Sequence, residues 1–349
     1  MRVAFFGTIS HAWQSSYQRL DCLRQTGAEV RACNTGASGV QLHWGQRIWR
    51  KLAYAPFSDR ELQRYNEGVA EACTGRQPEV VWLEWPLLLA RETLLGIRER
   101  WPGSTIVCFQ DDNPFDDRLY ERPRWRRFID NIPLYDVHFV KRPFDVTEFG
   151  KRGAKRALLF THGVYEPLFH PDPRPDGQRG PPIPVSFVGT ARDHRVECIS
   201  NLIGQHRIPV RVFGSMWERH WVRWRHRSHF STFVLNEAYS RVIWDSKISL
   251  AFVSSRNRDE YTMRTFEIPG SGGFFLAERT PKHQELYEEG REAEFFGSPE
   301  ECASKIAFYL RNEEARCRIA AAGRERCIRS NYSLTNRMRD ALAQLFPTR

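Results

Sequence analysis

Short apolar runs alternate with longer amphipathic segments along most of this 349-residue chain. In the first half, apolar runs that end in glycine or polar residues predict strands at 2–7, 28–33, 79–83, 104–110, 136–140 and 156–160. Apolar positions with helical spacing predict helices at 15–25 and 90–100. This alternation is typical of an open α/β sheet whose strands are mostly parallel.

A proline-rich segment interrupts the pattern at 171–184. It holds six prolines and two glycines in 14 residues (PDPRPDGQRGPPIP), which excludes a helix or a central strand and predicts a linker. The alternation then resumes, with strands expected at 185–188, 210–213, 247–253 and 273–277. The expected helices lie at 196–205, 236–245, 260–268, 299–311 and 313–330.

The pattern therefore predicts two Rossmann-like domains of parallel α/β type. We place the N-terminal domain at 1–175, the second at 176–330, and at 331–349 a C-terminal helix that packs back on the first. Ligands bind at the carboxyl ends of the strands in such sheets. We expect the two domains to face each other across a cleft formed at these ends.

Charge and cysteine content narrow the class of protein. The formal net charge of +10 favours anionic partners, such as nucleic acid, a membrane surface or phosphorylated small molecules. The eight cysteines show no metal-binding spacing and indicate reduced thiols. The apolar run near residue 1 is too short for a signal peptide, and no stretch of the sequence approaches the 18 apolar residues of a membrane-spanning helix. We therefore expect a cytoplasmic protein.

The segment RTFEIPGSGGFFLAE, at 264–278, carries the sharpest local signal. Arg264 and Glu267 stand three apart and share a helix face, and Pro269 is expected to end that helix. The following glycines allow the backbone to approach a ligand or to adopt a positive φ. A surface ion pair followed by a glycine cap is the alternative, but it explains poorly why the glycines lead directly into a strand.

This segment and residues 288–327 (EEGREAEFFGSPEECASKIAFYLRNEEARCRIAAAGRERC) resemble the CgeB-like, or spore maturation protein B type, glycosyltransferases. These belong to the group 1 glycosyltransferases with the GT-B fold. Other segments agree with the resemblance, which covers about 105–335: QDDNPFDD at 110–117, 135–160, HGVYEPLFHP at 162–171 and VSFVGTARDHR at 185–195.

The resemblance implies a donor site in the second domain. Glu267 matches the second glutamate of the Glu-x7-Glu element, which binds the ribose hydroxyls of the donor nucleotide. Asp259 stands where the first glutamate is expected. Arg264 and Lys247 are the candidates to balance the diphosphate, on which charge builds as the glycosidic bond breaks. A solvated position at a strand edge is the alternative for Lys247.

Further donor-site candidates follow from their positions near strand ends and glycines. Gly189 and Thr190 end the first strand of the second domain and can offer backbone N–H groups to phosphate. Gly214 is either part of the same site or a simple turn. The predicted donor set is completed by Thr262, Gly272 and Gly273.

Catalytic candidates in the first domain are His11 and the cluster Asp111–Asp112–Asn113. His11 follows the first strand, and the resemblance implies a role for it as the general base of an inverting enzyme, oriented by Asp111 or Asp112. The alternative for the cluster at 111–113 is an Asx turn before Pro114. The alternative for His11 is a solvent-exposed histidine in a loop. A metal is rejected because the resemblance implies metal-independent chemistry. His162 is expected to be structural or to face the acceptor.

Two runs combine tryptophan with basic residues. At 43–54 (HWGQRIWRKLAY), Trp44, Ile48 and Leu52 share one helix face, which favours packing on the domain over docking on an anionic membrane. At 217–230 (WERHWVRWRHRSHF) the pattern could stack bases. No nucleic-acid-binding signature supports that interpretation, and charge complementary to a diphosphate explains the second run.

The sequence thus predicts a glycosyltransferase with a nucleotide-diphosphate sugar as donor. The acceptor is a small molecule, a glycan or a protein held by the first domain, no cofactor or metal is expected, and contact with the inner membrane face stays open. Group 1 membership favours retention of the anomeric configuration, whereas a His11 base favours inversion; we expect retention. A GT-B-fold sugar-nucleotide epimerase and a basic nucleic-acid-binding protein are the alternatives.

Overall fold

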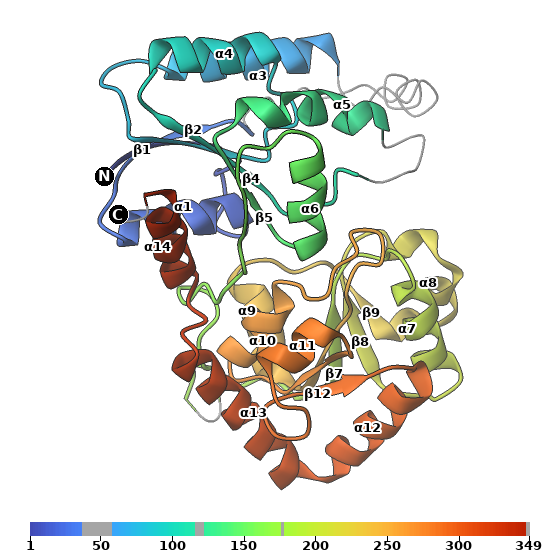
Figure 1. Ribbon diagram of the computed structural model, residues 1–349. Coiled ribbons are helices and arrows are strands. Elements are labelled where there is room, and N and C mark those ends of the chain that lie inside the picture. The colour runs from blue at the N-terminus through green and yellow to red at the C-terminus, as the bar shows by residue number, and fades with distance from the viewer. Residues whose placement is uncertain (37–57, 116–121, 176–177, 347–349) are drawn as a thin grey trace. The chain divides into compact units, whose positions relative to one another are not determined.

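The computed structural model describes residues 1–36, 58–115, 122–175 and 178–346 (Figure 1). The chain forms two units, of which unit 1 comprises Met1–Thr161 with Arg337–Arg349, and unit 2 comprises His162–Asn336. Each unit has its own parallel sheet and its own hydrophobic core.

The sheet of unit 1 contains six strands among the described residues. Its order is β2-β1-β3-β4-β5-β6, and all neighbouring strands are parallel. The strands are β1 (Arg2–Gly7), β2 (Glu29–Asn34), β3 (Val80–Glu84), β4 (Thr105–Gln110), β5 (Val137–Val140) and β6 (Ala157–Leu159). The central strand β3 is buried along its whole length, as expected for a parallel sheet covered on both faces.

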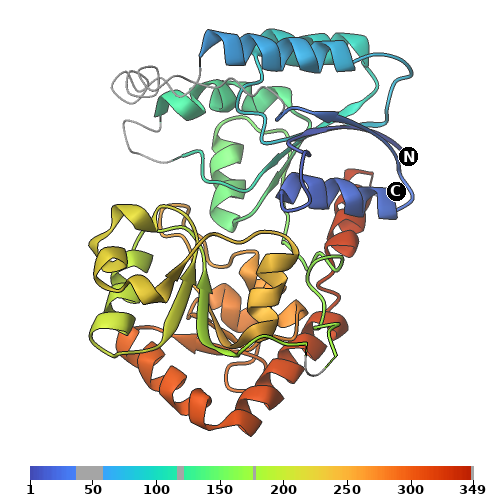
Figure 2. The ribbon, with the colours of Figure 1, turned by 180° about the vertical axis from the view of Figure 1, so that it is seen from behind.

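Helices cover both faces of this sheet. They are α1 (Ser15–Gln25), α3 (Asp59–Ala72), α4 (Arg91–Arg100), α5 (Arg122–Asn131), α6 (Pro143–Lys151) and α14 (Leu334–Leu345). In Figures 1 and 2, α3 and α4 lie side by side over one face, and α1 lies beside α14 on the other. A buried ion pair between Arg19 and Glu84, 2.6 Å apart, joins α1 to the carboxyl end of β3.

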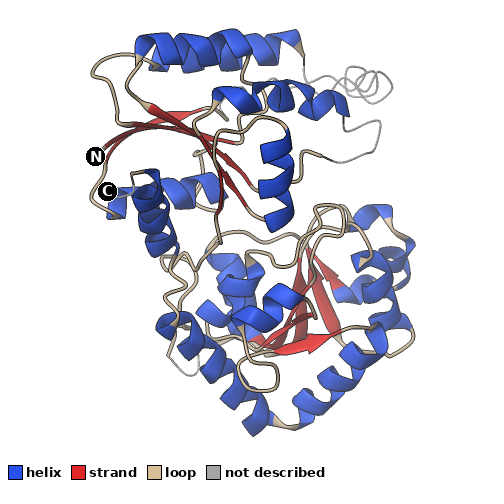
Figure 3. Ribbon diagram, in the orientation of Figure 1, coloured by secondary structure: helices blue, strands red, loops and turns tan. Residues whose placement is uncertain are grey.

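Unit 2 repeats this architecture with the order β12-β11-β10-β7-β8-β9, again with parallel neighbours. The strands are β7 (Ile183–Val188), β8 (Val210–Phe213), β9 (Phe230–Ser231), β10 (Ser246–Ala251), β11 (Phe275–Glu278) and β12 (Glu294–Phe296). Figure 3 shows this sheet between layers of helix. The helices are α7 (Arg195–Gly204), α8 (Trp221–Arg225), α9 (Glu237–Asp245), α10 (Arg264–Gly270), α11 (Pro281–Leu286), α12 (Pro299–Arg311) and α13 (Glu313–Arg329).

The observed units meet at 161/162, whereas the sequence placed the domain boundary at 175/176. Residues 162–175 belong to unit 2 because they pack on its helices: the carbonyl of Leu168 accepts a hydrogen bond from Ser240, and that of His170 accepts one from Trp244. The last helix returns to unit 1, where the carbonyl of Gln344 accepts a 2.7 Å hydrogen bond from Arg156.

The structure bears on the expectations about cysteines, membrane spans and the basic aromatic run. All eight cysteines are free thiols. Within the described ranges, no helix is both long enough and apolar enough to cross a bilayer. The aromatic and basic run at 43–54 lies outside the described residues.

The end of α10 differs from the predicted one. Pro269 was expected to end the helix, but it lies inside α10, which continues to Gly270. A proline at this position cannot donate to the carbonyl of Thr265, four residues earlier. The hydroxyl of the buried Tyr287 donates to that carbonyl instead, at 2.8 Å, so the helix tolerates the missing N–H group.

We expect Tyr287→Phe to lower the free energy of unfolding by about 1–3 kcal/mol, because the carbonyl of Thr265 loses a buried donor. In a Pro269→Ala background the new backbone N–H can donate to the same carbonyl, so the cost of Tyr287→Phe should be smaller. Urea unfolding of the four proteins of this double-mutant cycle measures the difference. Equal costs in the two backgrounds would contradict the compensation.

Candidate functional site

The carboxyl ends of β7 and β8 form a tight corner in unit 2. A Cβ atom at Gly214 would collide with the carbonyl of Gly189, so the chain approaches itself more closely here than a side chain allows. The indole of Trp217, which is fully buried, donates a 2.8 Å hydrogen bond to the carbonyl of Gly189. Beside this corner, the hydroxyls of Thr190 and Ser215 lie 3.2 Å apart.

Arg264 and Glu267, on α10, lie at the same edge of the sheet. The Nε of Arg264 donates a 2.6 Å hydrogen bond to the carbonyl of Val188, the last residue of β7. Glu267 is only 6% exposed, and Tyr239 donates to its carboxylate at 3.0 Å. Burial raises the pKa of Glu267, and the neighbouring Arg264 and the hydrogen bond from Tyr239 oppose the rise. Both residues therefore lie near the end of β7, and Glu267 is buried, unlike a carboxylate in a surface ion pair.

A second guanidinium, Arg195, belongs to this edge and was not predicted. It is the first residue of α7, and its Nε is buried without a hydrogen-bond partner in the described part of the chain. Burial, followed by the positive charge of Arg264, lowers the pKa of Arg195. The charges of Asp193, Glu278 and Asp259 act in the opposite direction. Arg195 ends the quoted segment VSFVGTARDHR, so a basic residue opening the helix after a Gly-ended strand was the available signal.

The loop between β10 and α10 brings Asp259 and Thr262 to the same edge. The backbone N–H of Asp259 donates to the carbonyl of Ser254, and the hydroxyl of Ser254 donates to Asp193 at 2.8 Å. Arg256 forms an ion pair with Asp193 at 2.9 Å. Thr262 is buried, and its hydroxyl has no hydrogen-bond partner among the residues that the structure describes.

His194 and Glu278 form a hydrogen-bonded pair at this edge. Glu278 is the last residue of β11, and its second oxygen accepts a 2.6 Å hydrogen bond from the backbone N–H of Val253. The hydrogen bond to Glu278 raises the pKa of His194, although partial burial lowers it. The carboxylate thus joins the ends of β10 and β11 to the start of α7.

Lys247, Gly272 and Gly273 lie at the opposite, amino edge of the sheet. Lys247 is the second residue of β10, which runs parallel to β7, so about five residues or roughly 16 Å of strand separate it from the level of Gly189. Gly272 has a φ of +77° and accommodates the turn after α10, and Gly273 packs against Ile243. These three predicted donor residues are therefore not brought together with the other seven.

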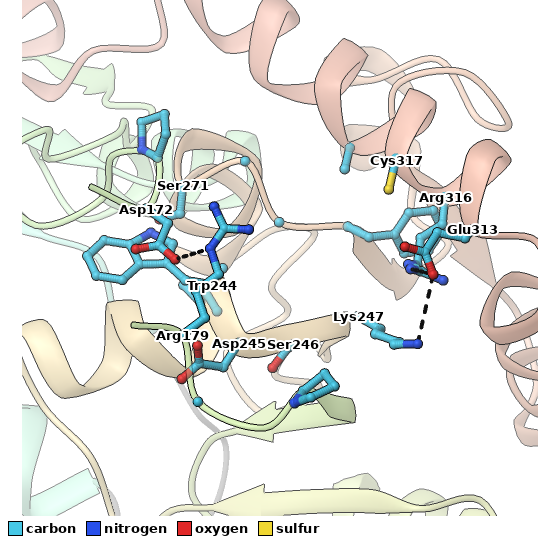
Figure 4. Close-up of a pocket in the computed structure, with 18 residues that line it drawn as sticks. Asp172, Arg179, Trp244, Asp245, Ser246, Lys247, Ser271, Glu313, Arg316 and Cys317 are labelled. Carbon is cyan, nitrogen blue, oxygen red and sulfur yellow. Dashed lines mark ion pairs between the residues drawn. The ribbon is translucent and has the colours of Figure 1, made fainter. Parts of the chain in front are cut away.

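A cavity of about 470 Å³ lies at this amino edge (Figure 4). The Nζ of Lys247 points toward Glu313, with 3.9 Å between the charged atoms, and Arg179 pairs with Asp172 across the cavity wall at 3.1 Å. The cavity and Lys247 thus belong to a part of unit 2 that is separate from the carboxyl edge.

The catalytic candidates His11 and Asp112 belong to unit 1. His11 is exposed and stacks on Trp13, with ring centroids 6.0 Å apart. Asp111, beside Asp112, accepts a 2.7 Å hydrogen bond from the indole of Trp85. Trp85 has a φ of +48°, a strained conformation for a non-glycine residue, and directly follows the carboxyl end of β3. The structure therefore places both candidates after strand ends of one sheet, and adds Trp85, which the sequence did not single out.

Two further predictions concern His162 and the absence of a metal. His162 is buried in unit 2, where it packs edge-on against Tyr261. In the described part of the chain, no group of three or more His, Cys, Asp or Glu side chains is arranged to hold a metal ion. Metal independence itself stays a prediction.

Comparisons with known proteins give a family match over part of the chain and a shared fold over nearly all of it. Residues 193–343 match the sequence model of a family described as "Glycosyl transferase-like". Among curated proteins, none matches the chain. The matched family segment contains α10, the loop before it and the carboxyl ends of β8, β10 and β11, whereas the end of β7 precedes the segment.

Solved structures share the fold over nearly the whole chain. Sucrose-phosphate synthase from Thermosynechococcus elongatus has a TM-score of 0.68 at 13% identity, and covers 99% of both chains. A glycosyltransferase from Rickettsia africae has a TM-score of 0.64 at 11% identity, with 99% of both chains covered. Anabaena HepE, in complex with UDP-glucose, has a TM-score of 0.62 at 10% identity and the same coverage.

The chain has the GT-B fold expected from its sequence, with a six-stranded parallel sheet in the described part of each unit. The family match covers less than half of the chain, so membership of the group 1 glycosyltransferases stays a prediction. The CgeB-like subtype stays a prediction.

Protonation of His194 should stabilise the folded protein, because its pKa is higher when folded than when unfolded. This stabilisation is complete below about pH 6.5 and disappears as the pH rises through the folded-state pKa. We therefore expect His194→Gln to lower the melting temperature more at about pH 6 than at about pH 9. Thermal unfolding at both pH values tests this, with His11→Gln as the comparison. An equal loss at both values would contradict the role of the pair.

Proposed function

We propose that the protein is a glycosyltransferase that uses a nucleotide-diphosphate sugar as its donor. The observation that carries the proposal is the pair of guanidinium groups, Arg195 and Arg264, at the carboxyl edge of unit 2. Two like charges close together in a partly buried place oppose each other, and a bound dianionic group relieves that repulsion. The family match over 193–343 supports the same assignment.

The diphosphate is proposed to lie between these guanidinium groups and the strand ends at Gly189 and Gly214. Arg195 offers a buried Nε–H donor that has no partner in the described structure, and bidentate contacts between arginine and phosphate are among the stronger hydrogen bonds. Thr190 and Ser215 add hydroxyl donors beside the corner. When the glycosidic bond breaks, the leaving diphosphate gains charge, and fixed cations at this place lower the barrier.

Glu267 is proposed to bind the ribose hydroxyls of the donor. A buried carboxylate costs free energy unless its oxygens accept hydrogen bonds, and two hydroxyl donors suit it. Asp259 and Thr262, from the preceding loop, are proposed to contact the sugar. We propose that unit 1 binds the acceptor and that the reaction retains the anomeric configuration, with His11 and Asp112 as the residues to test if it inverts.

Donor binding can be tested by thermal shift with UDP-, GDP-, dTDP- and CMP-sugars. We expect at least one diphosphate sugar to stabilise the wild-type protein. Glu267→Ala and Arg195→Met should each weaken binding of that donor about 10- to 150-fold, the loss expected for a charge-assisted hydrogen bond. Arg195 is preferred to Arg264 here because the latter also supports the backbone of β7.

Lys247→Met is the matched control, since it removes a cation of unit 2 at the opposite edge of the sheet. It should leave donor affinity unchanged. No stabilisation by any nucleotide sugar, or full stabilisation of the Glu267→Ala protein, would refute the proposed donor site.

Product analysis separates the proposed transfer from epimerisation. A transferase should release nucleoside diphosphate at a rate that depends on an added acceptor, whereas an epimerase would change the sugar while it remains attached to the nucleotide. Chromatography of the nucleotide products with and without a mixture of carbohydrate acceptors measures this. An epimerised donor formed without acceptor would contradict the transferase assignment.

A further inference from the structure

Helix α8 presents two tryptophans on the surface of unit 2. Trp221 is 62% exposed and Trp224 is 64% exposed, and residues three apart in a helix share one face. Exposed arginines accompany them: Arg225 within the helix, Arg219 before it and Arg227 after it. We call these five residues the Trp–Arg surface.

The charge of the Trp–Arg surface is not neutralised locally. Residues 219–227 contain four arginines, with Arg223 partly exposed, and no acidic residue. None of the four forms an ion pair with another described residue. This segment is therefore suited to an anionic partner.

The exposure of the two indoles does not arise from a loosely held segment. Trp217, just before α8, and Val222, within it, are fully buried. Trp217 also donates to the carbonyl of Gly189 and packs against Phe230, with ring centroids 5.4 Å apart. The helix is thus anchored on its inner side, and Trp221 and Trp224 face outward from a fixed support.

We propose that the Trp–Arg surface docks the protein on an anionic lipid bilayer. Indole rings favour the boundary between headgroups and acyl chains, because one edge is polar and the rest is apolar. Arginines beside them can bind lipid phosphates, and each basic residue near an anionic bilayer strengthens binding about fivefold. The net charge of +10 of the chain acts in the same direction.

A single-stranded nucleic acid is the competing partner, since bases also stack on aromatic rings among arginines. Successive bases need rings spaced along a strand within a groove. The two indoles here project from one face of a single short helix, which suits insertion side by side into one planar boundary. This surface is also independent of the run at 43–54, for which membrane docking was one sequence interpretation.

Co-sedimentation of the full chain with vesicles tests the proposal. We expect binding to vesicles that contain phosphatidylglycerol, weaker binding at higher salt, and little binding to vesicles of phosphatidylcholine alone. The double variant Trp221→Ala, Trp224→Ala should bind at least about tenfold more weakly because it removes the inserted apolar surface. The double variant Arg225→Gln, Arg227→Gln should bind about 25-fold more weakly, from about fivefold for each charge.

Matched controls come from the same unit. Phe308→Ala removes another exposed aromatic, from α12, and Arg318→Gln removes an exposed cation from α13; both should bind as the wild type does. Melting temperatures near that of the wild type show that each variant is folded.

Two results would overturn the proposal. One is that the wild-type protein does not co-sediment with anionic vesicles, and the other is that the variants of the Trp–Arg surface bind these vesicles as the wild type does. A parallel measurement uses a fluorescent single-stranded oligonucleotide. If the same variants lose the oligonucleotide while vesicles never bind, the partner is a nucleic acid and lipid docking is refuted.

Discussion

The hydrogen bond from Arg264 to the carbonyl of Val188 holds the carboxyl edge of unit 2 together. It joins the start of α10 to the end of β7, two elements that lie far apart in the sequence. Because all strands of this sheet are parallel, their carboxyl ends meet at one edge, and this bond determines which part of α10 faces that edge. Glu267 follows one helical turn later and is buried beside it. The rest of the proposed donor site is arranged around that pair.

Charged groups at this edge are buried before any ligand binds. Burying an ionised group is costly unless partners satisfy it, and three carboxylates at this edge have a named donor: Tyr239 for Glu267, Ser254 for Asp193, and His194 for Glu278. The Nε of Arg195 is buried there without a hydrogen-bond partner in the described structure, whereas that of Arg264 donates to Val188. A buried donor without a partner lowers stability, and the proposed anion site would supply that partner.

The two units repeat one architecture but differ in the chemistry at their strand ends. Unit 2 presents arginines and buried carboxylates, whereas unit 1 presents aromatic rings, with Trp13 against His11 and Trp85 against Asp111. The positive φ of Trp85 shows that its indole is held in place against a backbone preference. Aromatic rings beside carboxylates suit a polyhydroxylated ligand better than a phosphate, in keeping with a division between acceptor and donor.

Local patterns in the sequence predicted the fold class and many of the elements, but not α3, α5, α6, α11 or β12. The helix at 299–311 and the strand at 210–213 have the predicted bounds, because apolar spacing and flanking turn residues act within a few positions. The spacing of Arg264 and Glu267 on one helix is equally local. The donor role predicted for Lys247 did not follow from its position, because a residue at the start of a strand lies at the edge opposite to the strand ends.

Tertiary structure alone decided which distant residues meet. Arg195 follows β7 and Arg264 follows β10, and these two strands are neighbours in the sheet, although α8, α9 and the three strands β8, β9 and β10 separate the two residues along the chain. α10 continues past Pro269 because Tyr287, from another segment, supplies the missing hydrogen bond. The boundary at 161/162 likewise follows from the packing of residues 162–175 on α9. The proline-rich composition at 171–184 gives no information about that packing. A sequence pattern encodes local backbone preferences, whereas contacts between distant segments form only when the sheet is assembled.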